Sequence, residues 1–213
     1  MVTSTRLARS APECRREHIL DVARDLFVAE GFAAASMSSI AARLGGSKAT
    51  LYKYFPSKEA LFEAVMERKC ATILATLYDP DPPTGDVRDL LRTIGRRMLE
   101  VIFQPDALAL HRVVMAESVR FPEIARIFFA QGPERVQRQL AARLAALDAR
   151  GVIACSDPLL TAQQFLAMTK GELHMRVICG LAPSLTPEEI ERQIDHAVAL
   201  IAPGLERQAP AVA

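Results

Sequence analysis

An adjacent pair of glycines, Gly45-Gly46, constrains this 213-residue chain most, because it divides the stretch SMSSIAARLGGSKATLYKYFPSKEAL into two short apolar patterns. Apolar residues recur at helical spacing from Met37 to Leu44. Glycine tolerates a positive φ, which suits a helix end that must turn at once. Ser47 can then cap a second helix from Lys48 to about Phe55. We therefore expect two short helices joined by a tight turn.

The outward face of the second short helix is suited to DNA. Two short helices with a glycine turn form the helix-turn-helix signature, in which the second helix enters the major groove. Lysine ammonium groups can neutralise phosphates, and hydroxyl groups can hydrogen-bond with phosphates or bases. The residues that we expect at the DNA are Ser36, Ser47, Lys48, Ala49, Thr50, Tyr52, Lys53, Tyr54 and Lys58.

The run IAARLGGSKATLYKYFPSKEALF, preceded by a helix that ends AEGF, resembles the N-terminal domain of the TetR family of bacterial transcription regulators. The resemblance covers roughly residues 13 to 65. Its matching positions are Gly31, Ile40, Ala41, Gly45, Ser47, Leu51, Tyr52, Phe55, Ser57, Lys58 and Leu61. It implies that Lys58, at the start of a helix, binds a phosphate, and helix N-termini do favour anions. Ser39 replaces the family's usual acidic residue, so we expect the capping box that begins at Ser36 to be lost.

The rest of the chain also has the pattern of helices. The whole chain contains no tryptophan and few alternating β-branched runs, and with 50% hydrophobic residues it has ample material for a core. We expect helices over residues 13–30, 58–77, 87–103, 106–119, 134–149, 158–179 and 187–202, the first ended by Gly31 and the last by Pro203-Gly204. Residues 106–119 are apolar on nearly every side, which predicts a buried helix.

These patterns predict an all-α protein. We expect an N-terminal three-helix helix-turn-helix domain, residues 1–57, and a larger C-terminal helical ligand-binding and dimerisation domain, residues 58–213. Residues 58–77 form the connecting helix. The polar residues 1–12 are expected to be an arm, either a tail without contacts or an additional DNA contact. The stretch DPDPPTGD, residues 79–86, is expected to be a loop.

The segments LALHRVVMAESVRFPEIARIFFAQGP and FLAMTKGELHMRVICGLAPSLTPEEIE resemble the C-terminal domain of the AefR-like branch of the TetR family. The resemblance implies a homodimer formed by the helices near 158–179 and 187–202, and a pocket between the middle helices. Methionine and phenylalanine supply deformable apolar walls, and histidine supplies a polar handle. The expected pocket residues are Met98, Phe103, His111, Met115, Phe128, Phe129, Phe165 and Met168. Each also fits an ordinary core position, and His111 fits a hydrogen-bonded core histidine.

Other functional classes find little support in the sequence. No Ser/His/Asp, Cys/His or paired-carboxylate set stands at a catalytic spacing, and the glycines form no phosphate loop. The four cysteines form no CxxC pair and have no metal-ligand spacing with the histidines. We expect no catalytic residue, metal or cofactor. With neither a signal-peptide pattern nor a membrane-length apolar run, the expected location is the cytoplasm, without a membrane partner.

Together these features predict a ligand-responsive transcriptional regulator, most simply a repressor. It would bind a pseudo-palindromic double-stranded DNA operator as a homodimer and be released by a small apolar effector that the sequence does not identify. The alternative is a helical small-molecule-binding protein that does not bind DNA. That alternative gives no role to an exposed Lys48, Thr50, Tyr52 or Lys58.

Overall fold

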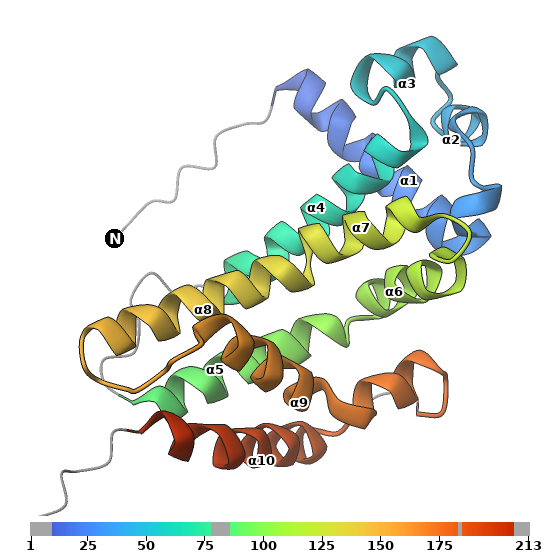
Figure 1. The fold of residues 1–213 in the computed structure, drawn as a ribbon. Coiled ribbons are helices and arrows are strands. Elements are labelled where there is room, and N and C mark those ends of the chain that lie inside the picture. Colours follow the sequence, from blue (N-terminus) through green and yellow to red (C-terminus); the bar gives the residue numbers. More distant parts are fainter. Residues whose placement is uncertain (1–9, 78–85, 183–184, 207–213) are drawn as a thin grey trace, which may run out of the picture.

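The computed structural model describes residues 10–77, 86–182 and 185–206, and it confirms the all-α class (Figure 1). The helices are α1 (Ala11–Ala34), α2 (Met37–Arg43), α3 (Lys48–Tyr54), α4 (Lys58–Leu77), α5 (Val87–Ile102), α6 (Pro105–Glu117), α7 (Pro122–Gln131), α8 (Pro133–Ala149), α9 (Pro158–Ile178) and α10 (Pro187–Leu205). None of these helices is long and apolar enough to cross a membrane. The expected arm and the expected loop at 79–86 lie almost wholly outside the described residues.

A first hydrophobic core lies at the end of the molecule that carries α2 and α3 (Figure 1). The apolar residues Ile19, Leu20 and Leu26 of α1 are buried there. Phe27, Phe32 and Phe62 pack with ring centroids 5.2 to 5.8 Å apart. This core extends beyond the first four helices, because Leu110 and Val113 of α6 are also part of it. The helix-turn-helix is therefore packed directly against the rest of the protein.

A second hydrophobic core joins α5, α8, α9 and α10, with Leu74 of α4 at its edge. Figure 1 shows α10 on the side of the molecule opposite α3. Three arginines on α5 pair with acidic residues on or just after α10: Arg88 with Glu206, Arg92 with Asp195 and Arg96 with Glu191, at 2.6, 3.0 and 2.7 Å. Exposed ion pairs contribute little energy each, so the apolar contacts beneath them hold these helices together.

Several helix ends differ from the sequence prediction. Gly31 breaks the helical geometry of α1 as expected, with φ 81°, but one further turn follows to Ala34. The predicted helix 158–179 is not continuous, because Gly171 adopts φ 52° and ψ −155°. The last helix passes through Pro203 and ends at Leu205. Proline there removes one hydrogen-bond donor, which the final turn of a helix tolerates better than its middle.

The prediction that residues 106–119 form a wholly buried helix was wrong. Met115 is 46% exposed and Val119, just beyond the end of α6, is 94% exposed. Leu110, Val113 and Val114 of α6 face the first core, and Leu108 packs against Val177 and Ile178, whereas the remaining side of the helix faces outward. Because α6 carries apolar residues on nearly all sides, those on its outer side, such as Met115, remain exposed.

Candidate DNA interface and effector cavity

Hydroxyl caps fix both helices of the helix-turn-helix. Gly45 has φ 62°, as the predicted turn requires, and Ser47 Oγ accepts a hydrogen bond from the Thr50 N–H at 3.1 Å. Ser36 Oγ accepts from the Ser39 N–H, and Ser39 Oγ accepts from the Ser36 N–H, both at 3.0 Å. The expectation that the capping box is lost was therefore wrong. A serine hydroxyl reaches the same backbone donor that a glutamate would reach.

The structure exposes much of the face of α3 that the sequence assigned to DNA. Ser36, Ser47, Lys48, Ala49, Tyr52 and Lys53 are exposed. Leu51 and Phe55 face inward and are buried. Thr50 is half-buried, and so is Tyr54, whose ring packs against the first core and leaves less of it free for a partner.

The helix-turn-helix surface is basic. The segment from Ser36 to Lys58 contains four basic residues and no acidic residue. One of the four is Arg43, an exposed side chain at the end of α2 that was missing from the expected DNA contacts. A surface without carboxylates does not repel phosphates, so this end of the molecule is suited to a polyanion.

Lys58 has protein partners in the structure. Its ammonium donates to the Phe32 carbonyl at 2.6 Å and lies 4.3 Å from the centroid of the Phe32 ring. The Phe121 ring centroid is 5.8 Å away. Lys58 thus caps the end of α1, and a phosphate at this lysine would have to share the ammonium with that carbonyl.

A carboxylate from α6 holds the same turn from the other side. Glu117 Oε1 accepts from the Phe32 N–H at 2.7 Å, and Oε2 accepts from the Ala33 N–H at 2.6 Å. Gly31 leaves the space for this contact, because a Cβ at that position would collide with Glu117 Oε1. The charge-assisted bonds tie α6 to the end of α1. The sequence did not predict this contact between α6 and α1, because Glu117 and Phe32 are 85 residues apart.

A cavity of about 190 Å³ lies between α4, α5, α6, α7, α8 and α9. Four of the expected pocket residues line it: Met98, His111, Phe128 and Phe129. The other lining residues are Met66, Lys69, Cys70, Leu74, Ile102, Ala107, Leu110, Gly132, Pro133, Val136, Gln137, Leu166, Lys170 and His174. Most of the lining is apolar, as expected for a small-molecule site.

The other expected pocket residues do not line this cavity. Phe165 is fully buried in the second core, where its ring packs against Gly95. Met168 packs against the same core, and Met115 points to the outer side of α6. Phe103 stands behind the cavity wall, with its ring centroid 5.7 Å from that of His174.

His111 and His174 form the polar part of the wall. Their ring centroids are 5.0 Å apart, and His111 stacks on Phe128 at 4.8 Å. Burial, reinforced by the positive charge of Lys170, lowers the pKa of each histidine to about 4. Both imidazoles are therefore neutral near pH 7. His111 has no hydrogen bond to any described residue, so it is not the hydrogen-bonded core histidine that the sequence left open.

Burial also raises the pKa of the Cys70 thiol to about 11, so this cysteine on the cavity wall is a neutral group. The described part of the chain holds no cluster of three His, Cys, Asp or Glu side chains arranged to bind a metal. The two histidines and Cys70 thus give the cavity neutral polar groups beside its apolar surface.

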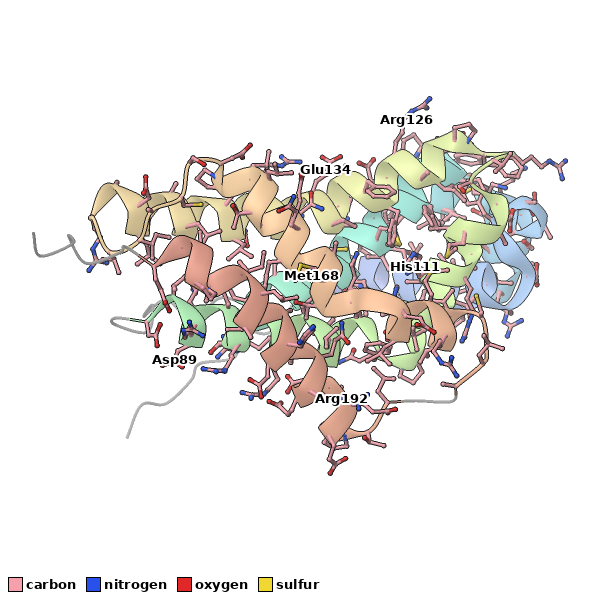
Figure 2. All side chains as sticks on the ribbon, turned by 60° about the horizontal axis from the view of Figure 1, so that its bottom comes forward. Asp89, His111, Arg126, Glu134, Met168 and Arg192 are labelled. Atoms are coloured by element: carbon pink, nitrogen blue, oxygen red, sulfur yellow. The ribbon has the colours of Figure 1, made fainter. Side chains whose placement is uncertain are left out.

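The outer face of α9 and α10 carries apolar side chains without cover in the single chain. Leu160 on α9 is 47% exposed, Met175 is 44% exposed, and Leu200 on α10 is 60% exposed. Ala167 and Ala199 on the same two helices are also exposed. In Figure 2 these helices form the near face of the molecule.

Comparisons with known proteins agree with this architecture. The family model described as bacterial regulatory proteins, tetR family, matches residues 19–65, and the AefR-like transcriptional repressor C-terminal domain matches residues 89–202. The solved structure of the flavonoid-responsive regulator FrrA is 36% identical, covers 92% of this chain and 100% of its own, and superposes with a TM-score of 0.81.

Two curated relatives extend the comparison. The HTH-type transcriptional regulator YvkB of Bacillus subtilis (strain 168) is 24% identical over 189 residues, which are 89% of this chain and 96% of YvkB. The HTH-type transcriptional activator FasR of Mycolicibacterium smegmatis is 32% identical over 111 residues, 52% of this chain and 50% of FasR.

The two family models and the FrrA structure agree on one assignment. The AefR-like match alone spans more than half of the chain, and the FrrA match spans nearly all of it. These relatives are DNA-binding regulators of transcription and not enzymes. The chain therefore belongs to the TetR family of bacterial transcriptional regulators, with a C-terminal domain of the AefR-like type.

Proposed function

We propose that this regulator is a repressor that binds a pseudo-palindromic operator as a homodimer and is released by a small effector with an apolar body. The observation that carries the proposal is that α6 reaches both functional parts. Ala107, Leu110 and His111 of this helix line the cavity, and Glu117 at its end holds the last turn of α1. An effector that displaces α6 therefore acts directly on the helix-turn-helix.

The proposed DNA contacts are the exposed residues of α3 and its cap: Ser47, Lys48, Ala49, Tyr52 and Lys53, with Ser36, Thr50, Tyr54 and Lys58 at the margins. Lysines and hydroxyls there would contact phosphates, and the start of α3 would face the base edges. The division at residues 57 and 58 remains our proposal for the domains. The first core extends past that point into α4 and α6, which suits two domains that must communicate.

Effector release requires that the effector bind two states of the protein with different affinity. In the structure, Glu117 and Lys58 together hold the N–H and carbonyl groups of Phe32. We infer that this held state is the one that binds DNA. Occupation of the cavity would move α6, release the turn and change the spacing of the two α3 helices in the dimer.

The proposed dimer forms through α9 and α10. Exposed leucines on both helices give an apolar surface that a second copy would cover, and a two-fold axis would place the two α3 helices on successive major grooves. Repression is favoured over activation because the matched C-terminal domain is described as that of a repressor. FasR, which is an activator, shows that a related chain can have the opposite effect.

A mobility-shift titration on DNA upstream of the protein's own gene tests DNA binding. The parent protein should retard the fragment, and raised salt should weaken the complex because phosphate contacts release counterions. Lys48→Ala and Tyr52→Phe should each lower affinity about two- to tenfold, the value of one lost phosphate contact. The helical content by circular dichroism should not change, because both side chains are exposed.

Arg150→Ala is the matched control, because it removes an exposed cation at the far end of α8. It should bind DNA as the parent does. If Lys48→Ala and Tyr52→Phe also bind as the parent does, the assignment of α3 contacts is wrong. If a genome-wide selection of fragments finds no bound DNA at all, the alternative of a small-molecule-binding protein without DNA binding takes its place.

A further inference from the structure

Among the described residues, one cation on the cavity wall lacks a compensating charge. The described residues that line the cavity include two lysines, Lys69 and Lys170, and no carboxylate. The carboxylate oxygens of Asp106 lie 2.7 and 2.8 Å from the Lys69 ammonium and neutralise it. Lys170 has no ion pair or hydrogen bond with any residue that the structure describes, and burial lowers its pKa below the ordinary value.

Two further polar groups near Lys170 are available to a ligand. Neither His111 nor His174 hydrogen-bonds to a described residue, although stacking fixes the orientation of both rings. Lys170 and both imidazoles line the same cavity, and the charge of Lys170 contributes to the lowered pKa of each histidine. The cavity therefore presents one positive charge and a neutral imidazole pair on an otherwise largely apolar wall.

The backbone holds Lys170 at this place. The helix breaks at Gly171, immediately after the lysine, and the Gln193 side chain from α10 donates to the Met168 carbonyl at 2.6 Å. The Thr169 hydroxyl donates to the Phe165 carbonyl at 2.8 Å. Figure 2 shows His111 and Met168 in the interior between the helices, with Arg126 directed outward from α7. Lys170 thus belongs to an anchored segment and not to a free surface.

We propose that the effector is an organic monoanion, with an apolar body and one acidic group that pairs with Lys170. A hydrogen-bonding group of the effector would meet the His111–His174 pair. An unpaired ammonium among apolar groups is costly, and an anion that pairs with it removes that cost, whereas a cation adds repulsion. Phe128, Phe129 and the methionines receive the body. This inference rests on the proposed function, because it names the class of its effector.

Two fluorescent probes with the same ring system test the charge requirement. 1-Anilinonaphthalene-8-sulfonate is an anion, and N-phenyl-1-naphthylamine lacks the sulfonate. The protein should bind the anion at least about tenfold more tightly than the neutral probe, which is the range of a charge-assisted hydrogen bond. The neutral probe is the more apolar of the two, so without a cation in the cavity the order would be reversed.

Variants at Lys170 assign the preference to one residue. Lys170→Met should lower affinity for the anion about tenfold and leave affinity for the neutral probe within about twofold. Lys170→Arg should restore the preference, because it restores the charge. Arg126→Met is the matched control, since it removes an exposed cation from the outer side of a helix that lines the cavity, and it should change neither affinity.

Fluorescence energy transfer from an introduced tryptophan to the bound probe reports where the probe binds. The chain has no tryptophan, so Phe129→Trp places a single donor at the cavity wall, at a side chain that is already 52% exposed. Efficient transfer to either probe supports binding close to this wall, and loss of the transferred signal of the anion in Lys170→Met assigns it to the cavity. Equal affinity for the two probes in the parent protein overturns the monoanion inference and leaves the proposed function standing. Absence of transfer to both probes removes the effector cavity itself, and with it the ligand-responsive part of the proposed function.

Discussion

At the scale of single residues, burial keeps two histidines on the cavity wall in their neutral form. His111 and His174 have their pKa values lowered to about 4 by burial and by the nearby charge of Lys170, whereas an exposed histidine titrates near 6.5. Between these values the unfolded chain binds more protons than the folded chain. Lowering the pH from about 6.5 toward 4 therefore reduces the free energy of unfolding, and above about 6.5 this contribution is fully present.

Urea unfolding at pH 7.5 and pH 5.0 measures this effect. The parent protein should lose stability at the lower pH, by at most about 1.4 kcal/mol per pH unit for each histidine. His111→Gln should make the loss smaller, since one group no longer takes up a proton on unfolding. His18→Gln, at an exposed position of α1, is the control and should retain the parent's loss. An unchanged pH dependence in His111→Gln would contradict the account.

At the scale of helices, the break in α9 positions the cavity wall. Gly171 has φ 52°, and a Cβ there would lie 2.6 Å from the Gln193 Nε2 that holds the Met168 carbonyl. Gly171→Ala should lower the free energy of unfolding by about 1–3 kcal/mol, through backbone strain and loss of that hydrogen bond. Chemical denaturation measures the change.

Gly204→Ala provides the comparison at this scale. Gly204 lies in α10 without a positive φ, and a Cβ added there would meet no atom of another described element within 4 Å. Alanine at this position should therefore be neutral or stabilise by up to about 1 kcal/mol. If both substitutions have the same effect, the break at Gly171 has no special role. The double variant Gly171→Ala with Gln193→Ala should recover only part of the loss, because the backbone strain remains.

Helix existence was predictable from the sequence because local chemistry determines it. The hydroxyl groups of Ser36, Ser47 and Thr186 cap helices where the sequence predicted that helices begin. The break at Gly171 was not predictable, since glycine in an apolar helical pattern is compatible with an unbroken helix. Its conformation depends on Gln193, which comes from another helix.

The cavity was predictable only in part, for a related reason. Phe128 and Phe165 both stand at helical spacing and look alike in the sequence, yet one lines the cavity and the other packs against Gly95 in the core. The difference depends on how the helices pack around them. Lys170 and His174 were missed because a polar residue on a long helix usually faces water.

At the scale of the whole molecule, the second subunit of the proposed homodimer would cover α9 and α10. Leu160→Glu and Leu200→Glu each place a charge on that exposed apolar surface, which a dimer would have to bury without a partner. Sedimentation velocity should show monomers at concentrations where the parent is a dimer, and operator affinity should fall because two half-sites are no longer bound together.

Val119→Glu is the control for the dimer, because Val119 is 94% exposed and lies beyond the end of α6. It should sediment as the parent does. Parent-like sedimentation of both leucine variants would place the subunit contact elsewhere on the molecule. Monomeric parent protein that still retards the operator would contradict the two-fold arrangement itself.

The contacts at the end of α1 have a consequence for protein engineering. They involve Gly31, Phe32, Lys58 and Glu117. A hybrid regulator made by grafting a foreign helix-turn-helix onto this effector domain would keep Glu117 but exchange its neighbours. Any donor with a side chain at the position of Gly31 would collide with that carboxylate. Such grafts should transmit a signal only when the donor also has glycine there, which makes this position a simple criterion for choosing compatible donors.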